Sequence, residues 1–126
     1  MRTILFHGKT LFTNEWKFGG YATMDGRHFI VDSTTYPDNT CSWGAYEVYP
    51  NSVGQFTGQF DAAGDPIHEG DIVYVPSEDE YANISWDVHM SKFTINFDGW
   101  FSDFDHFSGK DLEVRGNTFD EGWHEA

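Results

Sequence analysis

The chain has 126 residues, with seven basic and 21 acidic residues, 12 Phe, 6 Tyr, 5 Trp and a single cysteine. A chain of this length forms one hydrophobic core without needing disulfides, and the lone Cys41 excludes a disulfide within the chain. The formal net charge of −14 opposes generic binding to DNA, RNA or anionic membranes, and no apolar run is long enough to span a bilayer. With one cysteine and no charged-then-apolar opening stretch, we expect a protein that stays in a reducing cytosol.

Alternating apolar residues, β-branched residues and turn signals predict strands along most of the chain. In chain order the predicted strands cover residues 3–6, 27–31, 71–75, 84–88 and 93–97. The last two form a hairpin, Asp25-Gly26 precedes the second strand as a turn, and Pro76 closes the third because proline donates no ladder hydrogen bond. Only residues 51–55 suggest a turn of helix. The frequent glycines favour an all-β barrel or sandwich, a mainly β fold with few or short helices.

The negative charge is concentrated in the second half of the chain. Residues 1–63 hold four basic and six acidic residues, a net of −2, whereas residues 64–126 hold three basic and 15 acidic ones, a net of −12. The run Glu78, Asp79 and Glu80 is expected to lie on an exposed loop, because adjacent like charges repel inside packed elements. Two interpretations stay open: a surface that imitates the charge of nucleic acid, or acids that keep an aromatic-rich protein in solution.

Catalytic and metal-binding motifs are missing from the sequence. The six histidines are scattered singly, no second cysteine completes a zinc site, and there is no phosphate-binding glycine loop or nucleophile elbow. The stretch 103–113 resembles a calcium loop, but Phe107 and Ser108 stand at positions that the loop reserves for other residues. We therefore expect no catalytic residues, no metal and no cofactor, and the interpretation as an enzyme ranks last.

The most specific sequence pattern lies in residues 53–73. Its blocks are VGQFTG at 53–58, DAAG at 61–64 and IHEGDIV at 67–73, with ILFHGK at 4–9, Glu15-Trp16 before Gly19, and VRGN at 114–117 around them. This order of blocks resembles the YopX family, small proteins encoded mostly by bacteriophages and prophages, and it covers nearly the whole chain.

The resemblance implies a fold and a biological setting. It implies one mainly β domain over residues 1–126, with additional N-terminal strands and an SH3-like barrel at about 53–119. The tail after 120 is expected to be frayed because terminal residues are commonly poorly ordered. The resemblance also implies homo-oligomers in the cytoplasm of a bacterial host. Within the motif we expect a group of residues to shape turns rather than contact a ligand: Gly54, Gly58, Gly64, Glu69, Gly70 and Asp71.

The first functional hypothesis is a non-enzymatic phage accessory protein that acts against host defence. It would bind and sequester a small nucleotide-type signal in a pocket at a subunit interface, where an aromatic ring stacks on the base and a cation meets the phosphate. The candidates lie in the nearly neutral half: Trp16, Lys17, Tyr21, Arg27, Trp43 and Tyr46. The opposing interpretation is core packing for these aromatic residues and solvated surface for these cations.

Two further hypotheses need no small ligand. In one, the acidic half, with Glu78, Asp79 and Glu80, binds the basic groove of a host nuclease or defence effector through steered, salt-dependent association. In the other, the protein is a structural component of the phage particle.

Overall fold

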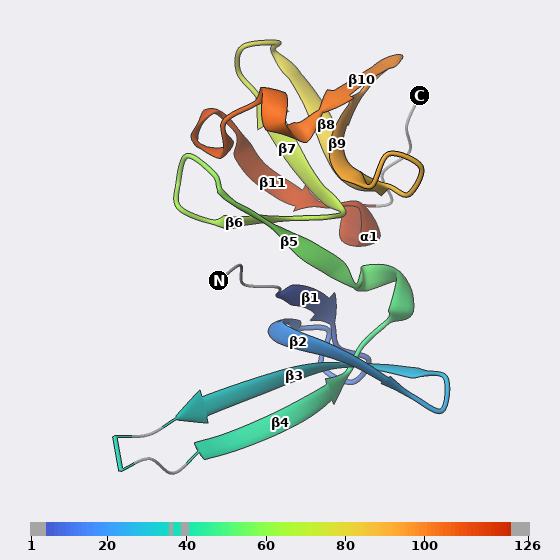
Figure 1. Ribbon diagram of the computed structural model, residues 1–126, viewed down its shortest axis with the longest axis vertical. Coiled ribbons are helices and arrows are strands. Elements are labelled where there is room, and N and C mark those ends of the chain that lie inside the picture. The colour runs from blue at the N-terminus through green and yellow to red at the C-terminus, as the bar shows by residue number, and fades with distance from the viewer. Residues whose placement is uncertain (1–4, 36, 39–40, 122–126) are drawn as a thin grey trace. The chain divides into compact units, whose positions relative to one another are not determined.

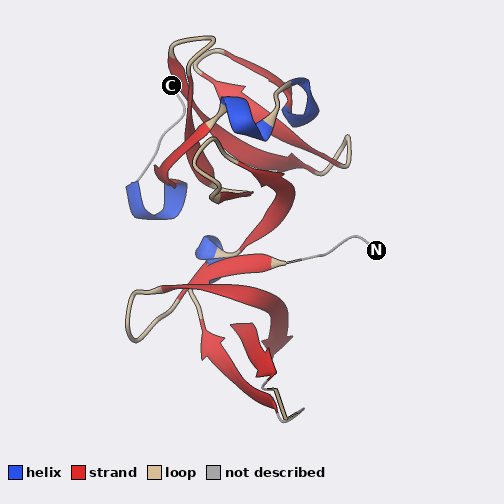
Figure 2. Ribbon diagram, turned by 90° about the vertical axis from the view of Figure 1, so that its left-hand side faces the viewer, coloured by secondary structure: helices blue, strands red, loops and turns tan. Residues whose placement is uncertain are grey.

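The computed structural model describes residues 5–35, 37–38 and 41–121, and strands make up most of them (Figure 2). The chain divides into two compact units, Met1–Gln55 and Phe56–Ala126. Four basic and five acidic residues give the first unit a net charge of −1, and three basic and sixteen acidic residues give the second −13. The charge asymmetry of the sequence therefore follows the division into units.

The first unit is an antiparallel sheet with the hydrogen-bonded order β4-β3-β2-β1 (Figure 1). Its elements are β1 (Phe6–Lys9), β2 (Trp16–Met24), β3 (Arg27–Thr35), β4 (Cys41–Glu47), the 3-10 turn η1 (Pro50–Ser52) and the start of β5 (Gly54–Phe60), which pairs with β1. Asp25 and Gly26 connect β2 to β3 with φ of 53° and 76°, the left-handed conformations that a tight hairpin requires. Ile30 and Val48 are fully buried, and Gly8 leaves room for Val48 because a Cβ there would meet its methyl groups at 3.0 Å.

The second unit contains the rest of β5, paired with β6, and a five-stranded antiparallel sheet with the order β10-β9-β8-β7-β11. Its elements are β6 (Pro66–His68), β7 (Asp71–Val75), β8 (Glu80–Asp87), β9 (Lys92–Phe97), β10 (Trp100–Asp103), η2 (Phe104–His106), η3 (Gly109–Asp111), β11 (Glu113–Asn117) and α1 (Thr118–Glu121). One apolar cluster fills its core: Ile67, Val73, Val75, Ala82, Ile84, Ile95, Phe97, Phe104 and Leu112.

Side chains alternate between the two faces of each strand, and this alternation explains which of them enter the core. Ala82 and Ile84 on β8 face the same side of the sheet as Ile95 and Phe97 on β9, and all four are buried. The residues between them, Asn83 and Asn96, are polar. Strand pairing therefore places an apolar face on the core and a polar face on the opposite side.

The predicted mainly β class is confirmed, whereas closure of a barrel is not found among the described residues, because the five-stranded sheet keeps β10 and β11 as edges. The strand predicted at 71–75 coincides with β7, and those at 27–31, 84–88 and 93–97 overlap β3, β8 and β9. The strand predicted at 3–6 overlaps β1, which begins at Phe6, and residues 3–4 lie outside the described part.

The helical turn predicted at 51–55 overlaps the 3-10 turn η1 at Pro50–Ser52, whereas Gly54 and Gln55 belong to β5. From residue 122 on, the predicted frayed tail lies outside the described residues. Within the part of the chain that the structure describes, no helix has the length and apolar character needed to cross a membrane.

Candidate functional site

A cavity of about 300 Å³ lies in the first unit. It is lined by Thr10, Phe12, Thr13, Glu15, Lys17, Arg27, Phe29, Ala45, Tyr46 and Glu47. These residues come from the segment between β1 and β2, the start of β2 and β3, and the end of β4. Residues far apart in the sequence thus meet because three consecutive antiparallel strands bring their ends together.

The segment between β1 and β2 is fixed by the hydroxyl of Thr10. Oγ1 of Thr10 lies 2.7 Å from Oγ1 of Thr13 and accepts a hydrogen bond from the backbone N–H of Glu15 at 3.0 Å. The backbone N–H of Thr10 also donates to the Glu15 carbonyl at 2.9 Å. This compact turn holds Phe12 at the cavity with 85% of its surface exposed, the largest exposure among the large apolar residues that the structure describes.

Arg27 contributes a guanidinium that is already oriented. Its Nη2 donates to Glu47 Oε1 at 2.7 Å, and its Cζ lies 5.3 Å from the centre of the Phe29 ring. This hydrogen bond raises the pKa of Arg27 and lowers the pKa of Glu47, so both groups stay charged near neutral pH. Glu47 occupies one N–H of a group that carries five, which leaves donors for a ligand.

Lys17 supplies the second positive charge. Its Nζ lies 4.7 Å from the centre of the Tyr46 ring and 3.5 Å from Glu15 Oε2. Together with Glu15, Arg27 and Glu47 it gives the cavity two cations and two carboxylates, with no net charge. The aromatic groups Phe12, Phe29 and Tyr46 complete the lining.

The structure brings three of the six predicted ligand-binding residues into this cavity, namely Lys17, Arg27 and Tyr46. Trp16 is not part of the lining; its ring lies 4.5 Å from the His7 ring and 5.9 Å from Lys9 Nζ. Successive residues of a strand point to opposite faces, which separates Trp16 from Lys17.

Tyr21 and Trp43 are also not lining residues. The Tyr21 hydroxyl bonds with Nδ1 of His28, and its ring stacks on that imidazole and packs against Phe6 at 5.3 Å. Trp43 pairs with Ser33 in the sheet, but its side chain lies outside the described part of the structure.

Sequence reasoning missed the two carboxylates and two phenyl rings of the cavity: Phe12, Glu15, Phe29 and Glu47. Acidic residues were interpreted as surface charges, and no local pattern marks Glu47 as the partner of Arg27, 20 residues away. The available signal was the run Thr10 to Glu15, in which threonines and Asn14 enclose an apolar residue, a composition typical of an ordered turn.

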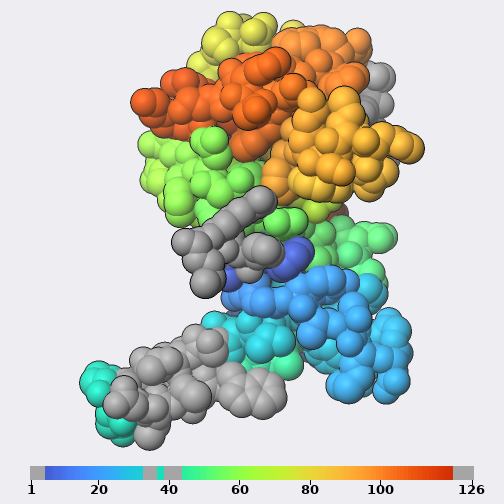
Figure 3. Space-filling model, in the orientation of Figure 1, coloured from blue at the N-terminus to red at the C-terminus, as the bar shows by residue number. Residues whose placement is uncertain are grey.

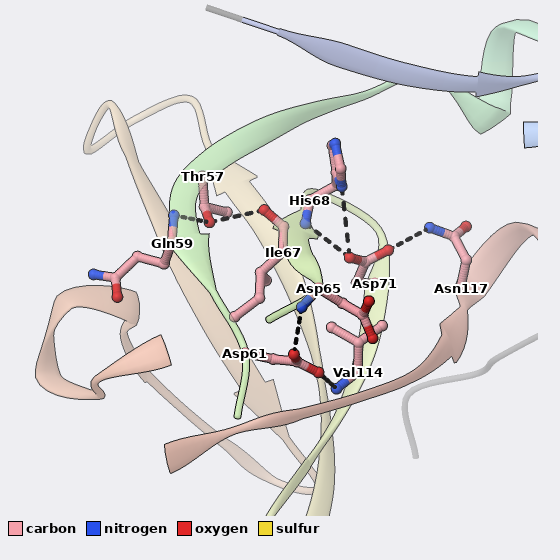
Figure 4. A network of polar contacts seen from close by, with 9 residues as sticks. All are labelled: Thr57, Gln59, Asp61, Asp65, Ile67, His68, Asp71, Val114 and Asn117. Atoms are coloured by element: carbon pink, nitrogen blue, oxygen red, sulfur yellow. Dashed lines mark hydrogen bonds and ion pairs between the residues drawn. The ribbon is translucent and has the colours of Figure 1, made fainter. Parts of the chain in front are cut away.

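The family-like motif forms a polar network in the second unit (Figure 4). The buried carboxylate of Asp61 accepts hydrogen bonds from the backbone N–H groups of Ala63 at 3.0 Å, Asp65 at 2.8 Å and Val114 at 2.9 Å. The Thr57 hydroxyl donates to the Ile67 carbonyl at 2.8 Å. Side chains of the motif thereby connect β5, its following turn, β6 and β11.

Asp71 is the second buried carboxylate of this network. Its Oδ2 accepts from the backbone N–H of His68 at 2.7 Å, and its Oδ1 accepts from Asn117 Nδ2 at 3.1 Å. Burial raises the pKa of Asp71 to about 7 and lowers the pKa of His68 to about 4. A carboxyl that is costly to ionise thus lies where β6, β7 and β11 meet.

The glycines of the motif have different backbone roles. Gly58, Gly64 and Gly70 have φ of 90°, 89° and 92°, whereas Gly54 begins β5 and pairs with His7. At Gly70 the backbone N–H donates to the Ile84 carbonyl at 2.7 Å, and its carbonyl accepts from Thr118 N at 2.8 Å. Asp71 follows it as a buried residue, and Glu69 before it is half-buried.

The predicted acidic surface lies at the turn between β7 and β8. Glu78 and Asp79 are exposed, Glu80 begins β8 half-buried, and the Tyr74 hydroxyl donates to Asp79. The other acidic group, in the calcium-like stretch, consists of Asp103, Asp105 and His106.

The carboxylate of Asp103 already has a cationic partner, because Lys92 Nζ lies 2.6 Å from its Oδ1. This ion pair connects the start of β9 to the end of β10.

Comparison with known proteins supplies the family. A search of curated proteins finds no match. The profile of the YopX protein family matches residues 6–122, nearly the entire chain. This range contains the cavity of the first unit, the polar network and the five-stranded sheet. The chain therefore belongs to the YopX protein family.

Proposed function

We propose that this protein is a non-enzymatic binding protein that takes a small nucleotide-type ligand in the cavity of its first unit. The observation that carries the proposal is the convergence of Lys17, Arg27 and Tyr46 on one cavity from three consecutive strands, β2, β3 and β4. Its volume of about 300 Å³ is at the small end of ligand pockets, which fits a mononucleotide better than a dinucleotide.

The lining offers a separate contact for each part of such a ligand. Phe29, Tyr46 and the exposed Phe12 provide ring surfaces on which a base stacks. Arg27 and Lys17 provide the charge-assisted donors that a phosphate requires. The carboxylates of Glu15 and Glu47 accept hydrogen bonds from ring or exocyclic N–H groups.

The two ion pairs of the cavity determine which ligand charge it favours. Glu47 and Glu15 hold the two cations in place, which lowers the ordering cost of binding, but they also compete with the ligand for the same donors. A cavity without net charge favours a ligand with a single phosphate and a donor-rich base over a highly charged polyphosphate.

A binding role also agrees with the chemistry of the lining. Among the ten lining residues there is no histidine, cysteine or serine, and the two threonine hydroxyls bond each other at 2.7 Å. That arrangement leaves no nucleophile beside a general base.

The test is isothermal titration calorimetry with a panel of nucleoside monophosphates, cyclic nucleotides and nucleosides. We expect Arg27→Ala and Lys17→Ala each to weaken binding by about tenfold, the size of one charge-assisted contact. Lys9→Ala is the matched control, since this cation of the same unit does not line the cavity. Glu47→Gln should strengthen binding because it releases Arg27.

Absence of binding across the panel would refute the proposal. So would an equal loss in the Lys9 variant, because the effect would then come from the general charge of the unit rather than from the cavity.

The biological setting stays a prediction. A bacterial host cytoplasm and homo-oligomers are expected from the family resemblance, and action in phage–host conflict is the hypothesis that we add to that setting. Exposed apolar side chains along β2, with Phe18 51% and Met24 63% exposed, support contact with another copy. A second subunit would then complete a pocket at the interface. The alternative role, as a structural component of the phage particle, predicts that the protein is found in purified virions.

A second candidate function is supported by the charge division. The second unit carries −13 against −1 in the first, and Glu78 and Asp79 are exposed at one of its hairpin turns. Such a unit suits an inhibitor that occupies a basic groove of a nuclease or defence effector. Replacing residues 78–80 by lysines should abolish inhibition of the target enzyme; an inhibitor that keeps its potency would exclude this surface.

A further inference from the structure

The polar face of the five-stranded sheet carries a ladder of hydrogen-bonded side chains, which we call the amide ladder: Asn83, Ser85, Thr94 and Asn96. Asn96 Nδ2 donates to Asn83 Oδ1 at 3.0 Å and to Ser85 Oγ at 2.7 Å. Ser85 Oγ lies 3.0 Å from Thr94 Oγ1. Asn83 and Thr94 are only 5% and 3% exposed, so this polar floor is fixed in position.

A cavity of about 390 Å³ lies over one end of the amide ladder. Ser85, Thr94 and Asn96 form its floor, and Val88 and Phe101, which are 72% and 56% exposed, also line it. Trp86 is a lining residue too, but its ring packs on Phe93 at 4.9 Å, on the face of the sheet opposite the ladder. The amber and orange atoms of this part of the chain form surface on the viewer's side of the second unit in Figure 3.

Exposed aromatic and aliphatic side chains around a polar floor have the composition of a protein-binding hot spot. Such sites combine buried anchors with a rim that excludes water. Met90, in the same hairpin turn as Val88, is another exposed apolar residue at 45%. The apolar surface here exceeds the scattered single residues that a solvated sheet face carries.

The charge of the site determines the chemistry of its partner. Asp87 lines the cavity, whereas no lysine or arginine does. Of the three basic residues in the second unit, Lys92 is bound to Asp103 at 2.6 Å and Arg115 to Glu113 at 2.6 Å. With a net charge of −13 in this unit, an anionic ligand is repelled and a cationic one is attracted.

The carboxylate of Asp87, whose residue pairs with Lys92 in the sheet, is fixed by backbone hydrogen bonds. Its Oδ1 accepts hydrogen bonds from the backbone N–H groups of His89 at 2.9 Å and Met90 at 3.1 Å, which fixes the carboxylate at the start of the turn. A carboxylate has acceptor sites beyond these two, so it retains capacity for a charged donor.

We propose that this cavity binds an arginine side chain on a basic segment of a partner protein. The guanidinium stacks on the ring of Phe101, which pairs with Asn96 in the sheet, donates to Asp87, and meets the oxygens of Ser85 and Asn96. Arginine suits the site better than lysine because its planar group combines stacking with several directed donors. This site is separate from the nucleotide proposal and does not depend on it.

The test is a titration of ¹⁵N-labelled full-length protein with the peptide acetyl-Gly-Arg-Gly-Arg-Gly-amide, followed by NMR at physiological salt. We expect chemical-shift changes at the side-chain amide of Asn96 and the backbone of residues 85–90 and 100–101. The peptide with lysine in place of arginine should bind several-fold more weakly.

Variants with matched controls separate the site from general charge. Asp87→Asn removes the charge but keeps an oxygen for the turn, and Phe101→Ala removes one exposed ring; each should weaken binding by about fivefold to tenfold. Glu78→Gln and Phe60→Ala are the controls, an acid and a 55% exposed ring of the same unit outside this cavity, and should change affinity less than twofold.

Three results would overturn the proposal. Chemical-shift changes spread evenly over the acidic loops would indicate unspecific electrostatic attraction. An equal loss of peptide affinity in Glu78→Gln and Asp87→Asn would indicate the same. Shifts at the amide ladder with neutral disaccharides but not with the arginine peptide would assign the cavity to carbohydrate instead.

Discussion

The buried carboxyl of Asp71 should make the folded state lose stability as the pH rises from about 4 to about 7. Its pKa rises from 3.8 to about 7 because burial disfavours the charged form more than its hydrogen bonds from His68 and Asn117 favour it. A proton is therefore bound more tightly in the folded than in the unfolded chain. The stabilisation is complete below pH 3.8 and disappears as the pH passes 7, a loss of about 4 kcal/mol.

The perturbation is Asp71→Asn, which keeps the shape of the side chain and removes its titration. In the variant the side-chain NH₂ group faces either the His68 N–H or Asn117 Nδ2, and two donors cannot bond to each other. This lost hydrogen bond lowers the free energy of unfolding by about 1–3 kcal/mol at every pH. The free energy of unfolding of the wild type minus that of the variant should therefore fall by about 4 kcal/mol between pH 4 and pH 8.

The assay is urea denaturation followed by tryptophan fluorescence, at half-unit steps from pH 4 to pH 8. The wild type must be compared with the variant because the titration of His68 changes stability in the opposite direction to that of Asp71. The pKa of His68 is about 4 in the folded protein, below the ordinary 6.5, so the stability that this neutral side chain contributes is lost as the pH falls from 6.5 to about 4. A His68→Gln variant should accordingly differ from the wild type with the opposite slope. A difference for Asp71→Asn that is constant, or that grows with pH, would refute the reasoning.

Three further predictions concern stability and are measured by chemical denaturation at pH 7. Gly70→Ala should lower the free energy of unfolding by about 1–3 kcal/mol, because φ is 92° and the new Cβ would lie 3.3 Å from Asn117 Nδ2. Gly58→Ala should lower it by only about 1 kcal/mol, since φ is 90° but nothing lies within 4 Å of the new Cβ. Equal losses in the two variants would contradict the steric argument. Ile84→Ala should cost about 2–5 kcal/mol because this side chain is 1% exposed in the core, and a loss below about 1 kcal/mol would place it outside. Asp61→Ala should cost at least about 2 kcal/mol by leaving three backbone N–H groups without their acceptor, and a neutral result would mean that water replaces the carboxylate.

The sequence predicts β8 and β9 from large apolar residues at every second position, and β7 from its β-branched and aromatic residues. β7, β8 and β9 carry the core residues Val73, Ile84 and Ile95, so their pattern reflects a buried face. β2, β4 and β5 were missed because they contain glycines and polar residues that read as turns. Their pairing is set by neighbouring strands and not by local propensity, as in the register of Gly20 with Val31.

The candidate site was predictable in part for a physical reason. In an acidic chain the few cations of the neutral half stand out, and this marked Lys17 and Arg27. The sequence does not show which ring each cation lies over, because Tyr46 reaches Lys17 only after β2, β3 and β4 have paired. Trp16 was assigned with them for its chemistry, and the alternation of side chains along β2 separates it from the cavity.

Native mass spectrometry of the wild-type protein, incubated with an equimolar mixture of mononucleotides, tests the central claim most directly. The account predicts a wild-type protein that retains one nucleotide mass per subunit, a Lys17→Ala/Arg27→Ala double variant that retains none, and a Lys9→Ala control that binds like the wild type. A wild-type protein that retains no nucleotide, or a double variant that retains it equally well, would contradict the assignment of the cavity.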